Sequence, residues 1–532
     1  MKLGTFASTV AHLKLRQILA RIRFLFRRVH VGRIEHPEVT ELRSSWREAI
    51  PSRTEFLGAT RFAFLNSIVE LSDSSSWNDS RLDKLLLYHL HYLDVLHAGS
   101  EGPTPEQGRE LIRRWIDNNP PAHGNGWEPY ALSLRIVNLI KWHFQVSHLD
   151  AVSVESLYLQ ARALRRQLEY HLLANHLFVN AKALYFAGLF FGGSEANEWK
   201  HVAKGILTDE LEEQILDDGG HFELSPMYHA LILADVLDLI NLQTAYADDA
   251  LRGLEDIAAR MLNWLAVMTH ADGHLARFND STDGVAPELL ELEQYAGRLG
   301  IEHELPSACE REILPASGYC RFVRGPARAI IDVGRIGPDY QPGHGHCDCL
   351  SFELSLYEQR FLVNTGVSTY ARSARRTLER QTAAHNTVSI EGIEQSDVWA
   401  AFRVGRRARP TQLETGDFSV SAAHDGFRNV NVTHRRSMSF DESRMTIVDS
   451  LEGDPGREGI AHFHFAPGVS PRLNGNSVDT ESGRLTFDNA DDIQLVEYQY
   501  AAGFYYLVPA MKLHVRFREY LKSTCDYANS VH

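Results

Sequence analysis

Apolar residues recur with a helical period between about residues 57 and 300. One such face begins at Leu82, Leu85 and Leu86 and continues for three more leucines, with charged residues between them. The same spacing runs through the segments 132–144, 154–173, 176–191, 227–246 and 251–269. About ten helices of roughly 15–20 residues predict paired antiparallel helices closed into an (α/α) toroid. A two-layer helical bundle fits this pattern equally well.

Beyond Pro315 the apolar period changes from helical to two. Phe352 and Leu354 alternate with Glu353 and Ser355, which is typical of a strand with one buried face. Shorter segments of the same kind are 328–333, 387–390, 437–440, 445–448, 462–465 and 495–500. Many short strands with little helix predict an antiparallel β-sandwich.

The change of period divides the chain near residues 301–317. The predicted fold class is therefore multidomain, α then β. We expect a basic N-terminal segment over 1–44, an (α/α) toroid over 45–310 and an antiparallel β-sandwich over 311–532.

Composition excludes several protein classes. The chain has 532 residues and a net charge of −15, which argues against a general nucleic-acid binder. Its five cysteines, an odd and sparse set, do not form a disulfide framework: Cys309, Cys320, Cys347, Cys349 and Cys525. No apolar run reaches the roughly 18 residues of a membrane span.

Residues 1–34 are unusually basic. They contain no acid and eight cations: Lys2, Lys14, Arg16, Arg21, Arg23, Arg27, Arg28 and Arg33. Apolar residues lie between these cations, so the segment fits an amphipathic helix. One interpretation is peripheral contact with an anionic membrane surface, and the other is a helix packed on an acidic body. The segment lacks a signal-peptide pattern, so we expect a cytoplasmic protein.

Two polar clusters lie at the starts of predicted helices. The first runs from Asn175 to Asn180, where an asparagine can satisfy free N–H groups. The second ends in Ser225-Pro226-Met-Tyr228-His, in which Ser225 and Pro226 fit the N-cap and the first turn. Tyr228 then lies where its hydroxyl can face a cleft, or can simply be the wet end of a half-buried ring.

Two further clusters lie in the predicted sandwich. His344 and His346 are flanked by glycines, and such a pair suits a metal or a proton-transfer site as well as a polar strand entry. The segment 371–409 holds eight arginines, among them Arg380, against four acids. Arginine forks bind carboxylates and sulfates, so this segment suits an acidic substrate or a solvated charged face. Phosphate-loop, dinucleotide, serine-hydrolase and zincin motifs are absent from the sequence.

In this order the four clusters resemble those of the heparinase II/III-like polysaccharide lyases. The similar stretches are NHLFVNAKALYFAGLFF, DDGGHFELSPMYH, GHGHCDCLSFEL and TAAHNTVSIEG followed by QSDVW. The family includes heparin or heparan sulfate lyases and alginate lyases. The resemblance implies a toroid followed by a sandwich, with the substrate cleft between them, and cleavage of uronate-containing glycans by β-elimination.

The same resemblance implies roles for individual residues. Asn175 would neutralise the uronate carboxylate, with His176 as a further contact. Tyr228 would protonate the O4 leaving group, or act as both base and acid when proton and leaving group lie on one side of the sugar ring. His344 would be the base when they lie on opposite sides. Tyr370 matches a tyrosine that some alginate-cleaving relatives use as acid.

The resemblance also implies zinc in the sandwich, held by residues matching His346, Asn364 and His385, and no organic cofactor. The middle ligand is normally an aspartate, and asparagine is a poor zinc ligand. We therefore expect weak zinc binding or none, unless Asp348 supplies the missing charge.

Together these features predict a lyase acting on an anionic polysaccharide, linked to capsule or O-antigen synthesis because no export signal is present. Glu223 and Arg380 are expected to contact the substrate. Two alternatives remain: a glycoside hydrolase using Glu223 and Asp218, and a non-catalytic glycan-binding or assembly factor. The family resemblance also allows a periplasmic or envelope location, and the sequence does not indicate an oligomeric state.

Overall fold

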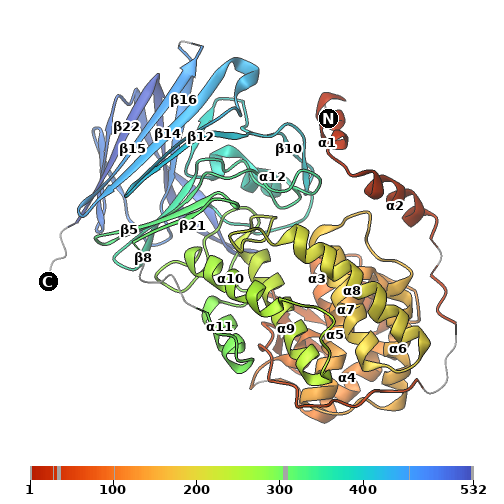
Figure 1. Ribbon diagram of the computed structural model, residues 1–532. Helices are drawn as coiled ribbons and strands as arrows, with labels where there is room; N and C mark the ends of the chain where they lie inside the picture. Colours follow the sequence, from red (N-terminus) through yellow and green to blue (C-terminus); the bar gives the residue numbers. More distant parts are fainter. Residues whose placement is uncertain are drawn as a thin grey trace.

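The computed structural model describes residues 3–27, 29–32, 37–100, 102–303, 310–454 and 456–528 (Figure 1). Helices occupy the first part of the chain and strands the second. Among the residues singled out above, Lys2, Arg28, Arg33 and Cys309 lie outside the described part.

The helices are α1 (Leu3–Ala11), α2 (Leu15–Leu25), α3 (Lys84–Tyr92), α4 (Pro105–Asn118), α5 (Pro129–Gln145), α6 (Ala151–Arg165), α7 (Ala174–Phe190), α8 (Ser194–Gln214), α9 (Pro226–Tyr246), α10 (Leu254–Val267), α11 (Leu289–Arg298) and α12 (Ala374–Arg380). Within the described residues, none of them is long and apolar enough to cross a membrane.

The strands are β1 (Glu55–Phe56), β2 (Arg61–Phe64), β3 (Ser67–Glu70), β4 (Arg311–Leu314), β5 (Tyr319–Arg324), β6 (Ala327–Asp332), β7 (Phe352–Leu356), β8 (Gln359–Leu362), β9 (Val388–Ile390), β10 (Val398–Trp399), β11 (Arg403–Val404), β12 (Pro410–Gly416), β13 (Ser419–His424), β14 (Val432–Asp441), β15 (Arg444–Gly453), β16 (Glu458–His464), β17 (Arg472–Asn474), β18 (Ser477–Asp479), β19 (Gly483–Asp488), β20 (Asp492–Gly503), β21 (Tyr506–Arg518) and β22 (Tyr520–Tyr527). The prediction of a helical domain followed by antiparallel β-sheets is confirmed.

The helical domain is built around α7, which is buried on nearly every side and packs against α5, α8 and α9. Its predicted range, 176–191, nearly coincides with the observed helix. Ser225 caps α9 as predicted, because its hydroxyl accepts from the Tyr228 N–H and Pro226 occupies the first turn. These two helix starts place Asn175 and Tyr228 at the same end of the domain.

Two parts of the helical prediction were wrong. The helical pattern does not begin at residue 57, because β2 and β3 form a hairpin whose turn places Leu65 and Asn66 at positive φ. Alternate residues of these strands are buried, so period two holds locally. The predicted segment 154–173 is also too long, since α6 ends at Arg165.

The sandwich consists of two facing layers. One is an eight-stranded sheet in the order β12-β13-β14-β15-β22-β19-β18-β17. The other combines the five-stranded sheet β4 to β8 with β20-β21-β16-β9, joined by a bridge between Leu362 and Phe465. The rings of Phe322 and Phe440 stack across the core, with their centroids 5.2 Å apart. The four described cysteines are buried here as free thiols.

The alternation of β14 buries two polar side chains as well as apolar ones. His434 and Arg436 lie on the core face and both bind the Asp449 carboxylate of β15, the closest contacts being 2.7 Å each. Burial alone raises the pKa of a carboxyl group, but Arg436 and His434 outweigh it and lower the pKa of Asp449 to about 2. Arg436 also donates to two main-chain carbonyls, so this cluster connects the sheet to the loops beneath it.

We expect Asp449→Asn to destabilise the protein by about 3–5 kcal/mol, because it leaves the buried Arg436 charge without its partner. Because folding lowers the pKa of Asp449, its contribution is present above about pH 4 and is lost as the pH falls toward 2. Chemical denaturation at neutral pH measures the loss. Asp488→Asn is the control, since that side chain is 61% exposed and its ion pair contributes no more than about 1 kcal/mol. Equal losses in both variants would contradict the assignment.

Candidate functional site

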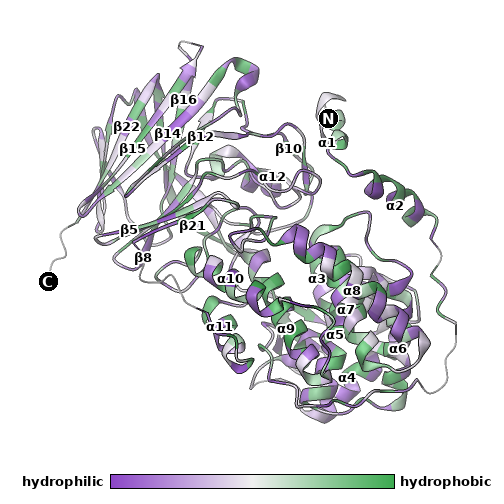
Figure 2. Ribbon diagram, in the orientation of Figure 1, coloured by the Kyte–Doolittle hydropathy of each residue, from purple (hydrophilic) through white to green (hydrophobic). Residues whose placement is uncertain are grey.

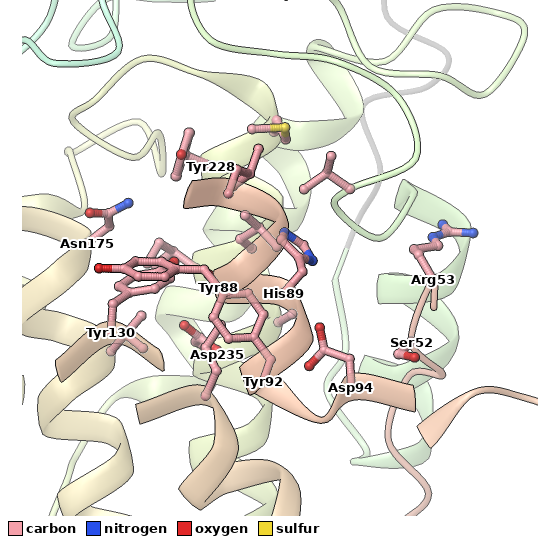
Figure 3. A pocket seen from close by; sticks show the side chains of 18 of the residues that line it. Ser52, Arg53, Tyr88, His89, Tyr92, Asp94, Tyr130, Asn175, Tyr228 and Asp235 are labelled. Atoms are coloured by element: carbon pink, nitrogen blue, oxygen red, sulfur yellow. The ribbon is translucent and has the colours of Figure 1, made fainter. Parts of the chain in front are cut away.

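A cavity of about 610 Å³ opens where the helical domain meets the sandwich. Helices α3, α5, α7 and α9 form its deeper wall, and sandwich loops carrying His344, Tyr370 and Phe402 close the other side. Figure 3 shows Tyr88 and Tyr130 among the side chains that line it, together with Asn175. The cavity therefore lies in the predicted cleft, and five of the predicted site residues line it: Asn175, His176, Tyr228, His344 and Tyr370.

His344 is fixed in place by a buried carboxylate that the sequence analysis missed. Its Nδ1–H donates to Asp280 Oδ2 at 2.8 Å, which leaves the Nε2 atom for other contacts. Arg376 donates to both oxygens of the same carboxylate. Burial alone would raise the pKa of Asp280, but Arg376 and the two histidines His344 and His346 hold this pKa well below its usual range. The carboxylate therefore stays ionised and fixes the tautomer of His344.

Two tyrosine hydroxyls meet beside this imidazole. Tyr228 stacks on the His344 ring with centroids 3.8 Å apart, and its hydroxyl lies 3.2 Å from that of Tyr370. Burial raises the pKa of Tyr228 well above 10, and the neighbouring Tyr370 adds to the effect. Burial likewise raises the pKa of Tyr370. At neutral pH both phenols are therefore proton donors.

Asn175 and His176 lie in the first turn of α7, on the cavity wall. His176 Nδ1 pairs with Glu169 at 3.2 Å. Burial disfavours the charged imidazole, but the Glu169 carboxylate outweighs burial and raises the pKa of His176. The Asn175 amide group has no hydrogen-bond partner among the described residues, which leaves it free for a ligand.

The cavity floor carries a charged network that the sequence analysis also missed. Lys182 of α7 binds Asp235 and Asp238 of α9 at 2.5 and 2.6 Å, and Lys141 of α5 binds Asp238 at 2.5 Å. Asp235 and Asp238 lie a turn apart on α9, whereas the two lysines lie on other apolar helices, so the sequence alone does not show that these charges meet. The paired charges satisfy one another and leave a polar floor.

Two residues expected to contact the substrate lie outside the cavity lining. The guanidinium of Arg380 is fully buried and donates to the main-chain carbonyls of Gly345 and Ala401. From the same arginine-rich segment it is Arg403 that lines the cavity, and it has no carboxylate partner among the described residues. Glu223 is 2% exposed and lies on the Nε2 side of His344, with its Oε2 atom 3.5 Å from that nitrogen.

The hydrolase pair is also separated from the cavity. Asp218 accepts hydrogen bonds from the main chain and hydroxyl of Ser317, and neither Asp218 nor Glu223 lines the cavity. A glycosidase needs two carboxyl groups flanking the bond to be cut. The structure therefore does not support that alternative.

The residues at the zinc position form a buried cluster. His346 Nε2 donates to Asp280 Oδ1 at 2.8 Å, and His385 Nδ1 donates to Asn364 Oδ1 at 3.0 Å. Burial lowers the pKa of both imidazoles, that of His346 to about 4. His346 Nδ1 and His385 Nε2 are buried without partners.

This donor set lacks the anionic ligand that the resemblance leads us to expect. Two neutral imidazoles and an amide leave the ion's full charge uncompensated. Asp348 does not help, because it accepts from the Asn279 main chain and burial raises its pKa to about 6. Within the described residues, no group of three histidine, cysteine or carboxylate side chains is placed to hold a metal.

Sequence comparisons connect the chain to known proteins. It is 24% identical over 323 residues to a heparin-sulfate lyase of Bacteroides stercoris, covering 56% of this chain and 46% of that protein. It is also 24% identical over 408 residues to FtsZ-localized protein C of Caulobacter vibrioides, covering 72% of this chain and 66% of that protein. The chain thus matches about half the length of the heparin-sulfate lyase.

Structural comparisons agree on the fold. The crystal structure of heparinase III matches with a TM-score of 0.66 and 18% identity, over 86% of this chain and 78% of that one. A chondroitin AC lyase of Streptomyces coelicolor A3 matches with a TM-score of 0.54 and 10% identity, over 98% and 80%. The family models for the heparinase II/III N-terminus and the heparinase II/III-like C-terminal region match residues 110–297 and 310–522, so the chain belongs to the heparinase II/III-like family.

Proposed function

We propose that this protein is a polysaccharide lyase that cleaves a uronate-containing glycan by β-elimination. The observation that carries the proposal is the convergence of Tyr228, Tyr370 and the Asp280-bound His344 on one cavity. Two protonated phenols next to an imidazole that is bound through Nδ1 to a carboxylate supply candidates for both the acid and the base. Such groups, positioned by their neighbours, are what a proton abstraction followed by leaving-group protonation requires.

In the proposed reaction His344 Nε2 takes the proton from C5 of the uronate. The electron pair forms the C4–C5 double bond as the C4–O4 bond breaks, and Tyr228 donates its proton to O4. Asp280 stabilises the imidazolium that forms, by the hydrogen bond it makes to Nδ1. If proton and leaving group lie on the same side of the sugar, Tyr228 would serve as base too, which its raised pKa makes costly.

Negative charge develops on the uronate carboxyl group when C5 loses its proton. The unpaired amide of Asn175 and the guanidinium of Arg403 both reach the cavity and are suited to bind this group. Because His176 is paired with Glu169, we assign it to the shape of this wall and to secondary contacts with the sugar. The polysaccharide is a heparan sulfate, an alginate or another uronate polymer.

A non-catalytic glycan-binding factor is the alternative to be tested. Incubation with heparan sulfate, alginate and hyaluronan should produce new ultraviolet absorbance from the C4–C5 double bond. A protein that binds one of these glycans without producing that absorbance would contradict the lyase proposal.

Tyr228→Phe should lower the elimination rate by about 10²–10⁴-fold, because it removes the positioned proton donor. Binding should persist, and the lost hydroxyl contact to Tyr370 should cost no more than about 1 kcal/mol of stability. Initial rates and thermal melting measure the two effects. Tyr520→Phe is the control, since that ring is 50% exposed and lies on β22, away from the cavity. A Tyr228→Phe enzyme with a near-normal rate would contradict the assigned role.

We further propose that the cluster of His346, Asn364 and His385 works without zinc. Protein purified without added metal should contain far less than one zinc per chain, and chelators should leave its melting temperature unchanged. Asn364→Asp supplies the missing anion and should raise zinc occupancy, whereas Asn386→Asp changes a neighbouring buried amide outside this cluster and should not. Elemental analysis decides the matter. One chelator-resistant zinc in the unmodified protein would overturn the proposal.

A further inference from the structure

Helix α2 lies on the body of the protein with its apolar face toward solvent. An amphipathic helix of a globular protein normally buries its apolar stripe. Here the buried side chain is Gln17, which is 3% exposed and donates to the Leu172 carbonyl. The exposed side chains include six apolar ones: Leu15, Ile18, Leu19, Ile22, Leu25 and Phe26. Leu25 and Phe26 are 76% and 82% exposed.

These six side chains form one continuous stripe, which we call the α2 apolar face. At 3.6 residues per turn they occupy a sector of roughly 120°, and Gln17, Ala20 and Phe24 occupy the opposite side. Figure 1 shows α1 and α2 at the outer edge of the molecule, and Figure 2 shows hydrophobic and hydrophilic colours together on α2. In the described structure the stripe remains uncovered.

The helix is held in this orientation by contacts on both domains. Lys14, just before α2, forms an ion pair with Glu213 of α8, and the Phe24 ring lies 3.9 Å from that of His171. Helix α1, which precedes α2, is held to the sandwich: its Thr9 hydroxyl donates to the Val404 carbonyl and accepts from the Trp399 indole N–H. The outward apolar face is therefore part of the folded arrangement.

Cations border the α2 apolar face on both sides. Arg16 and Arg23 lie along one edge and Arg21 along the other, all exposed, while Arg27 follows the helix end. Residues 1–34 contain no acid, in a chain whose net charge is −15. An apolar stripe bordered by arginines complements a surface with an apolar interior and anionic headgroups.

We propose that α2 docks the protein on an anionic lipid bilayer, lying in the headgroup region with its apolar face buried. The sequence left open whether this segment meets a membrane or packs on the body, and the structure points to both: the polar side packs and the apolar side remains for lipid. Gln17 of α2 contacts Leu172, and Lys14 lies over the ring of Tyr340, the neighbour of Gln341. Because Leu172 and Gln341 line the cavity, docking would hold the cavity near the membrane surface.

Sedimentation of the full chain with phosphatidylcholine vesicles, with and without phosphatidylglycerol, tests the proposal. We expect binding to the anionic vesicles and its weakening by salt. Ile22→Ser with Leu25→Ser should weaken binding at least about tenfold, because two apolar side chains no longer enter the bilayer. The matched control is Ile68→Ser with Leu290→Ser, an equally exposed pair on β3 and α11. The control should bind like the unmodified protein.

Arg21→Gln with Arg23→Gln gives a second, independent measurement. Each arginine should contribute about fivefold to anionic vesicle binding and nothing to binding of neutral vesicles. The melting temperature should stay unchanged in all these variants, since the altered side chains are exposed. The proposal is overturned if the unmodified protein does not bind vesicles, or if the Ile22 and Leu25 variant binds normally. It is also overturned if the α2 apolar face mediates dimerisation instead. In that case the unmodified protein would be a dimer, and the Ile22 and Leu25 variant would be a monomer that still binds vesicles.

Discussion

The site depends on one buried carboxylate, that of Asp280. It lies in the helical part of the chain between α10 and α11, whereas its side-chain partners Arg376, His344 and His346 belong to the sandwich. A carboxylate without water is costly unless charges and hydrogen bonds replace that water. The three partners provide them only when the two domains are docked. An interaction that helps to join the domains therefore also orients the proposed base.

Sharing one carboxylate also separates the two histidines of the sequence motif. The different roles that the resemblance implies for these histidines require a departure from regular strand, and residues 341–351 lie outside β7, with Leu350 at positive φ. Oδ2 of Asp280 holds His344, whose side chain is 12% exposed at the cavity, while Oδ1 holds His346, which is buried. One histidine is thus available to a ligand, and the other supports the loop.

Periodicity predicted the parts of the fold that obey it. Helix α9 and strand β14 follow a single period, so 227–246 and 437–440 were placed correctly. The β2–β3 hairpin was missed because two four-residue strands are too short to interrupt a helical pattern. The site was predictable where a residue lies in a stretch that resembles the family's, as for Tyr228, although its role remains a prediction. Asp280 was missed because it belongs to no periodic pattern. Counting arginines could not show that Arg403 lines the cavity, whereas Arg380 donates hydrogen bonds to main-chain carbonyls.

Binding a glycan and cleaving it place different demands on this cavity. Recognition needs ring faces and hydrogen-bond donors, which Tyr88, Tyr130 and Asn175 already offer. It does not need an imidazole whose tautomer is fixed by an ionised carboxylate, stacked on a phenol that burial keeps protonated. Maintaining the buried charge of Asp280 at that point is costly, and recognition alone would gain little from it. Proton transfer would gain directly, because it needs a base and an acid held in different protonation states at the same pH. The arrangement around His344 therefore favours a lyase over a binding protein.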